Sequence, residues 1–159
     1  MPLLPFFEWC ETTAISEAIK TSPWAFAVIE SIHLLGLGIL GGSILVVDLR
    51  MLGLGLRHQR IADLARDAQP WLIGSLAVML LTGSALFLSE ALKCYYNPSF
   101  WVKMTTLPLA LLFTFTVRRK VTSAEDGRIG PCRQKVVALV SLGLWFLVAA
   151  AGRWIGFSG

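Results

Sequence analysis

The chain has 159 residues, of which 55% are apolar and only 15% are charged, and its mean hydropathy is +0.68. Soluble domains are nearer 45–50% apolar and about 25% charged. This composition excludes an ordinary soluble domain and indicates an integral membrane protein, with the lipid bilayer as its first partner. The net charge is +4, but the basic segments lack the interleaved aromatic residues of a stacking platform, so no nucleic acid is expected.

The first 22 residues contain three glutamates, which interrupt the apolar stretch that a cleavable signal would need. Their apolar side chains fall near helical spacing instead, which predicts an N-terminal interfacial helix over about residues 5–20, lying on the membrane before the chain turns inward at Pro23. A frayed terminus is the alternative. The apolar positions are Phe6, Trp9, Ile15 and Ile19.

Four segments have the roughly 20 mostly apolar residues that cross a hydrocarbon layer about 30 Å thick. They cover about residues 23–47, 71–92, 101–117 and 136–157. Between the first two, the sequence IADLAR has helical spacing and predicts a short amphipathic helix that ends before Pro70. We therefore expect an all-α fold, a polytopic four-helix transmembrane bundle that forms a single membrane domain of residues 1–159.

Ten of the fourteen lysines and arginines follow the first and third spans. The positive-inside rule places these two connections in the cytoplasm. Both termini and the 93–100 connection are then extracytoplasmic, in what we expect to be a bacterial cytoplasmic (inner) membrane. Cys10 and Cys94 would lie on this oxidising outer side, where a disulfide between them and two unpaired thiols are equally compatible with the sequence.

Glu30 and His33 lie inside the first span, roughly 9 Å and 13 Å beyond Trp24 at 1.5 Å per residue, and on one helix face. Ionisable residues at such depth are costly and normally mark a function. Three more ionisable residues fall in the outer half of the other spans, namely Glu90, Lys103 and Arg153. We expect Glu30 to pair with Lys103 or Arg153, which leaves His33 as a neutral ligand, a proton carrier or a hydrogen-bond donor.

A structural reading competes with this one. Lys103, Glu90 and Arg153 are near enough to the surface to act as ordinary anchors, and Glu30 with His33 could be a buried polar pair that fixes helix register. In the inner half, only Asp48 and Arg50 stand out, and they read as an interfacial pair. Since no polar pathway is visible there, the sequence favours a ligand site over transport.

The first span continues as IHLLGLGILGGSILVVDLRMLGL, and the third begins NPSFWVKMTTLPLALL. This pattern resembles a group of small bacterial four-helix membrane proteins of unknown function. It is more distantly similar to the copper-resistance D family and to four-helix protoporphyrinogen oxidases of the HemJ type. The resemblance implies functional roles for a histidine early in one helix and for a cation after an aromatic residue at the start of another, which here are His33 and Lys103.

The only other histidine is His58, on the opposite side of the membrane, so a bis-histidine haem within one chain is excluded. Haem b or a porphyrin could use His33 as iron ligand, with Met104 as a weak sixth ligand or none, and with Lys103 and Arg153 facing the propionates. A quinone is the other cofactor considered. Copper and zinc would need more ligands than the chain offers.

Three function classes remain open, and whether the protein is an enzyme is open with them. The first is a redox-cofactor or small-ligand protein in a membrane electron-transfer or oxidoreductase context, with its site at Glu30, His33, Lys103, Met104 and Arg153. The second is a small proton or ion carrier. The third is a non-catalytic accessory subunit or homo-oligomer, whose small-residue faces, such as Gly38 and Gly42, pack against other chains.

Overall fold

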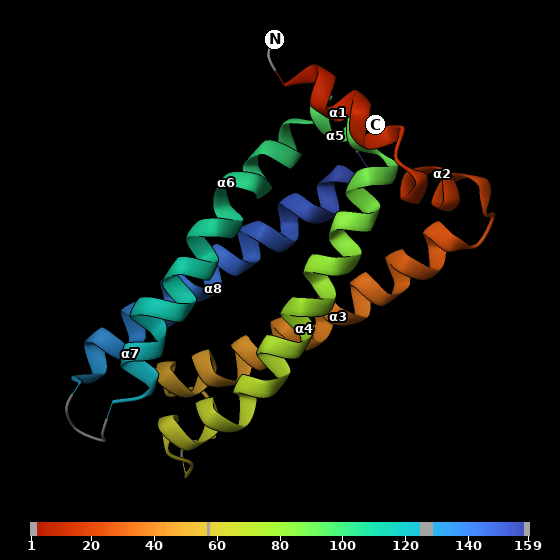
Figure 1. Ribbon diagram of the computed structural model, residues 1–159. Helices are drawn as coiled ribbons and strands as arrows, with labels where there is room; N and C mark the ends of the chain where they lie inside the picture. Colours follow the sequence, from red (N-terminus) through yellow and green to blue (C-terminus); the bar gives the residue numbers. More distant parts are fainter. Residues whose placement is uncertain (1–2, 57, 125–128, 158–159) are drawn as a thin grey trace.

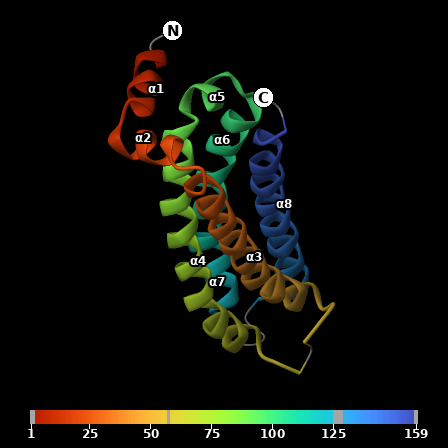
Figure 2. The same ribbon diagram turned by 90° about the vertical axis from the view of Figure 1, so that its right-hand side faces the viewer.

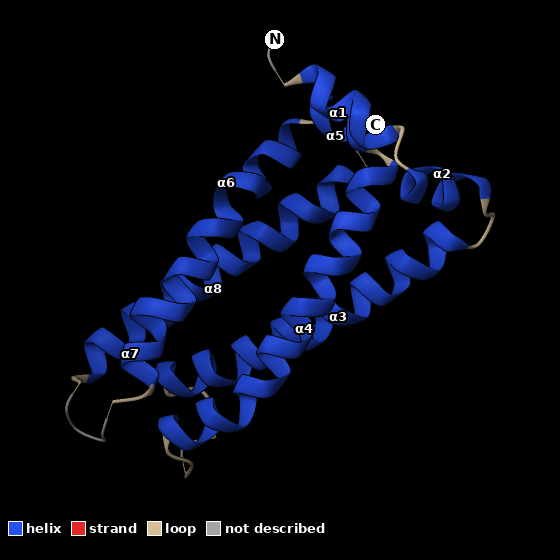
Figure 3. Ribbon diagram, in the orientation of Figure 1, coloured by secondary structure: helices blue, strands red, loops and turns tan. Residues whose placement is uncertain are grey.

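The computed structural model describes residues 3–56, 58–124 and 129–157. Every regular element in these residues is a helix (Figure 3). Four helical segments are long and apolar enough to cross a membrane, which confirms the four-span, all-α prediction. They are α3 (Ala25–Leu52), α4 (Ile61–Ser89), the continuous run Pro98–Thr122 and α8 (Pro131–Ile155). The run consists of α6 (Pro98–Phe113), the π-helix η1 (Thr114–Arg118) and α7 (Arg119–Thr122).

The long helices form an elongated bundle (Figures 1 and 2). Helix α3 packs mainly against α4, α6 packs against α8, and α8 joins the two pairs through its contact with α3. Both termini and the 93–100 connection lie at one end, as predicted, and we call this the terminal end. The opposite end carries the described residues of the connections that follow α3 and α7, and we call it the basic end. At that end, α3 stops at Gly53, whose left-handed φ of 79° favours glycine.

Two helices extend beyond the segments predicted at the basic end. The amphipathic segment before Pro70 is not a separate helix, because α4 starts at Ile61 and continues through the proline. A proline inside a membrane helix removes one N–H donor, here the partner of the Arg66 carbonyl, and packing against neighbouring helices compensates for that loss. The third span is likewise longer than predicted, since the helical run reaches Thr122.

The N-terminal segment forms two short helices rather than one, α1 (Leu4–Glu11) and α2 (Ala14–Thr21). The helix breaks at Thr13, whose side chain accepts a hydrogen bond from the Ser16 N–H and thereby caps α2. Helix α1 packs on α5 (Ala91–Tyr96), and the ring centre of buried Phe7 lies 5.1 Å from that of Tyr95 in α5. The two short helices and α5 therefore form a cap at the terminal end (Figure 2).

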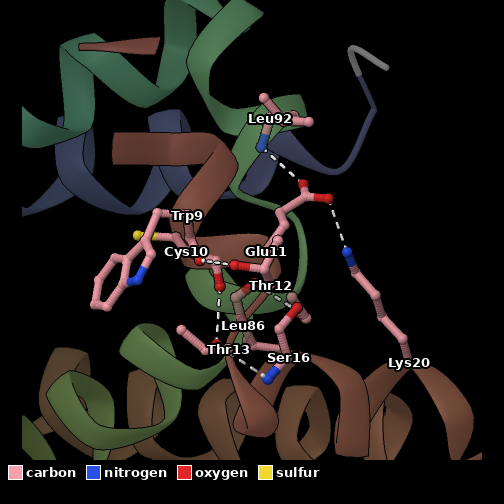
Figure 4. A network of polar contacts seen from close by, with 10 residues as sticks. Trp9, Cys10, Glu11, Thr12, Thr13, Ser16, Lys20, Leu86 and Leu92 are labelled. Carbon is pink, nitrogen blue, oxygen red and sulfur yellow. Dashed lines mark hydrogen bonds and ion pairs between the residues drawn. The ribbon is translucent and has the colours of Figure 1, made fainter. Parts of the chain in front are cut away.

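Glu11 joins the three parts of this cap (Figure 4). Its Oε2 accepts a bond of 2.7 Å from Lys20 Nζ of α2, and its Oε1 accepts one of 2.8 Å from the Leu92 N–H, which is free at the start of α5. Burial opposes ionisation of the carboxyl group, but the two bonds together outweigh it and hold the pKa of Glu11 below its ordinary value.

We expect Glu11→Gln to loosen the cap, because a neutral amide forms weaker bonds than a carboxylate does with Lys20 and the Leu92 N–H. Because the pKa of Glu11 is lowered in the folded state, the carboxylate stabilises the cap at neutral pH. This stabilisation is lost as the pH falls through the lowered folded-state pKa. Hydrogen-exchange protection of residues 4–21, compared at pH 7 and pH 3, measures both effects. Exposed Glu8→Gln on the same helix is the control, and equal protection in the two variants would contradict the role of Glu11.

Cys10 and Cys94 are free thiols, both buried in the apolar cluster under the cap. Burial, together with the nearby Glu90 carboxylate, raises the pKa of Cys94 to about 11. The thiol therefore stays protonated and poorly reactive at neutral pH. A disulfide between the two cysteines stays a prediction that the free thiols of this structure do not test.

Candidate functional site

His33 lies half-buried on the face of α3 that packs against α4. Its Nδ1 is 2.8 Å from Thr82 Oγ1. Its ring lies over Gly83, where the Cβ of any larger residue would come within 3.2 Å of His33 Cε1. The absence of a side chain at Gly83 therefore creates the space that the imidazole occupies.

The hydrogen bonds around Thr82 define which ring nitrogen of His33 carries a proton. Thr82 Oγ1 donates its only proton to the Val78 carbonyl, at 2.6 Å, so it can only accept a bond from His33. His33 Nδ1 is therefore the donor, and in the neutral ring Nε2 keeps its lone pair. This is the arrangement in which a histidine binds a metal or accepts a proton through Nε2.

Lys103 occupies a similar position between the other pair of helices. Its side chain extends from α6 over Gly152 of α8, with Nζ 3.4 Å from the position that a Cβ would take there. Lys103 also lies within electrostatic range of His33 and of Cys94. The two residues that the resemblance selected thus come from different helix pairs and lie within electrostatic range of each other.

The other predicted site residues are less closely associated with this pair. Glu30 is half-buried and forms no ion pair within the described residues, so the expected pairing with Lys103 or Arg153 is not formed. The Arg153 guanidinium lies over the exposed Phe157 ring, at 4.6 Å from its centre. Met104 is 41% exposed, while Lys103 beside it is half-buried. The geometry therefore centres the candidate site on His33, Thr82 and Lys103.

The half of the bundle toward the basic end contains a buried ion pair that the sequence analysis did not predict. Asp48 Oδ1 accepts a bond of 2.8 Å from Arg118 Nε, although the two residues are 70 positions apart. Arg118 Nη2 also donates to the Ile44 carbonyl, at 3.3 Å. The interpretation of Asp48 and Arg50 as an interfacial pair is wrong, because Asp48 is fully buried and Arg50 instead donates to the Gln59 carbonyl.

A sequence signal for this burial did exist, since Asp48 follows Leu40 and Ile44 at four-residue intervals and shares their buried face. Its carboxylate interacts with the Ser141 hydroxyl of α8, but neither Asp48 Oδ2 nor Ser141 Oγ has a hydrogen bond of full geometry within the described residues. Between this pair and His33, the middle of the bundle is filled by apolar side chains. The buried members of that cluster are Leu40, Ile44, Leu72, Ala110, Trp145 and Val148.

Comparison with known proteins gives one match. A family model described as a family of unknown function, DUF6644, matches residues 6–158. No curated protein matches the chain, and no solved structure does.

Proposed function

Because this chain belongs to DUF6644, a family whose function is unknown, we propose a function from its own residues: it binds a redox cofactor or small redox ligand at His33. The observation that carries the proposal is the Thr82 bond, which leaves Nε2 of His33 as the free nitrogen. We infer that the site takes a haem or porphyrin, or a quinone, in a membrane electron-transfer or oxidoreductase context.

The chemistry of this pair of side chains supports both kinds of ligand. Nε2 of His33 would ligate the iron of a haem, and the Lys103 ammonium would attract a propionate. A quinol would give a hydroxyl proton to Nε2, while Lys103 would stabilise the negative charge that develops on the oxygen. Met104 is too exposed to favour it as a second iron ligand, so His33 is the iron ligand that we propose from this chain.

The proposal includes an orientation. Ten of the fourteen cations follow the first and third spans, which supports a cytoplasmic basic end and an extracytoplasmic terminal end in a bacterial inner membrane. The site at His33 would then lie in the outer half of the bilayer, where a ligand exchanges with extracytoplasmic redox partners.

The test is the ligand content of the purified protein. We expect a Soret band in the absorption spectrum if the ligand is a haem or porphyrin, or a co-purified quinone in the solvent extract. His33→Ala is expected to lose it. Thr82→Val keeps the shape of residue 82 but removes its hydroxyl, so affinity is expected to fall about 10–100-fold, as when other partners of ligating histidines are removed.

His58→Ala is the matched control, because His58 is exposed at the basic end, and this variant is expected to retain the ligand. A protein that carries neither a tetrapyrrole nor a quinone would overturn the proposal. Retention of the ligand in His33→Ala would overturn the assignment of His33.

A proton or ion carrier is the second candidate, and the Asp48–Arg118 pair favours it, because it supplies the polar group of the inner half that the sequence did not reveal. The apolar cluster around Leu40 and Ile44 weighs against it, since it separates the two polar sites. Proton flux into liposomes that is lost in His33→Ala would select the carrier. Co-purification of another chain at fixed stoichiometry, with no flux and no ligand, would select the accessory subunit.

A further inference from the structure

A cavity of about 190 Å³ lies at the basic end between α3, α4, η1 and α7. Its wall on α4 includes three alanines, at positions 62, 65 and 68, whose short side chains leave space between the helices. Opposite them, the π-helix η1 contributes Arg118 and Phe115. Such π-turns within α-helices are frequent at functional sites.

The cavity is lined by three cations, Arg66, Arg118 and Arg119, and no carboxylate is among its lining residues. Asp48 neutralises Arg118 from behind, and Asp63 lies 4.0 Å from Arg66. Arg119 forms no ion pair within the described residues. The cavity therefore keeps a net positive charge.

Arg118 lines the cavity, and only some of the N–H donors of its guanidinium group form hydrogen bonds within the described residues. Its Nε and Nη2 bond to Asp48 and to the Ile44 carbonyl, and its Nη1 has no hydrogen bond among the residues described. Gln69 and Ser123 add further donor groups to the lining. A buried guanidinium edge surrounded by other donors is suited to the oxygens of a phosphate group.

We propose that this cavity binds the phosphate group of an anionic phospholipid. Its position at the end of the membrane spans places it at headgroup level, and basic pockets between helices at that level bind anionic lipids. Val47, Leu72 and Phe115 supply an apolar wall, against which the glycerol and the first part of an acyl chain pack. The proposal is independent of the function proposed for His33, because the two sites lie at opposite ends of the bundle.

The experiment measures lipid adducts on the detergent-solubilised full chain by native mass spectrometry, with phosphatidylglycerol and phosphatidylcholine in competition. We expect the wild type to prefer phosphatidylglycerol. Each of Arg66→Gln and Arg119→Gln is expected to reduce this preference about fivefold. Ala65→Leu, which fills the cavity without changing the charge, is expected to reduce it by a similar factor.

Arg133→Gln and Lys135→Gln are the matched controls, since both residues are exposed at the start of α8 and neither lines the cavity. They are expected to leave the preference unchanged. An equal loss in these controls, or no preference in the wild type, would overturn the proposal. Inorganic phosphate is titrated separately, and a rise in Tm with phosphate but no preference for phosphatidylglycerol would also overturn it, because the site would then take a free anion. If Ala65→Leu does not fold, the two arginine variants decide alone.

Discussion

Replacing Arg118 by alanine is expected to lower the free energy of unfolding by about 3–5 kcal/mol. The reason is that the buried carboxylate of Asp48 loses its ion-pair partner. Asp48 is fully buried and its Oδ1 accepts its hydrogen bond from Arg118. Apart from Arg118, the side chain that interacts with this carboxylate is the neutral hydroxyl of Ser141. Without the guanidinium, the bundle must hold an uncompensated charge or protonate it, and either route costs more than the lost bond itself.

Titration of the micelle-bound protein with a denaturing detergent, followed by the loss of helix signal, measures this effect. Lys120→Ala is the control, because Lys120 is an exposed cation two residues further along and is expected to change stability by less than about 0.5 kcal/mol. The double variant Asp48→Leu with Arg118→Met removes both charges and is expected to recover most of the loss, since apolar replacements of buried ion pairs are often neutral or stabilising. A loss below 1 kcal/mol in Arg118→Ala would contradict the buried-pair description.

A comparison with His33 shows why the sequence predicted the site at His33 but did not predict the buried Asp48–Arg118 pair. His33 stands out because it interrupts an apolar run far from either end, and no loop assignment can account for it. Arg118 stands next to two other cations at the end of an apolar run, where an arginine that anchors the helix and a buried arginine have the same sequence pattern. Only the continuation of the helix through η1 turns Arg118 into the bundle.

The same limit applies to contacts between distant segments. The four spans follow from hydropathy, because each span is decided locally by length and composition. An even number of spans then places both termini at the same end of the bundle. The bond between Glu11 and the Leu92 N–H joins positions 81 residues apart, and no local pattern encodes it. The spaces left by the missing side chains of Gly83 and Gly152 were only partly predictable from the sequence. Small residues indicate close helix packing, but they do not show which side chain enters the space.

The second large expected effect comes from filling the space over Gly83 that the His33 ring occupies. Gly83→Leu is expected to destabilise the bundle by about 1–3 kcal/mol, because the new side chain occupies the space of the His33 ring and the neighbouring helix must shift. Displacement of the imidazole also breaks its bond to Thr82. We therefore expect the variant to lose any ligand held at Nε2, even though His33 itself is unchanged.

Gly74→Leu is the matched control on the same helix, because a Cβ at Gly74 meets no atom within 4 Å. Leucine has a higher helix propensity than glycine, by somewhat less than about 1 kcal/mol, so this variant is expected to be as stable as the wild type or slightly more stable, and to retain the ligand. The two substitutions have the same chemistry and differ only in what faces them. Equal stability and equal ligand content in both would mean that the His33 ring does not depend on the space above Gly83, and the positioning of Nε2 by Thr82 would lose its structural basis.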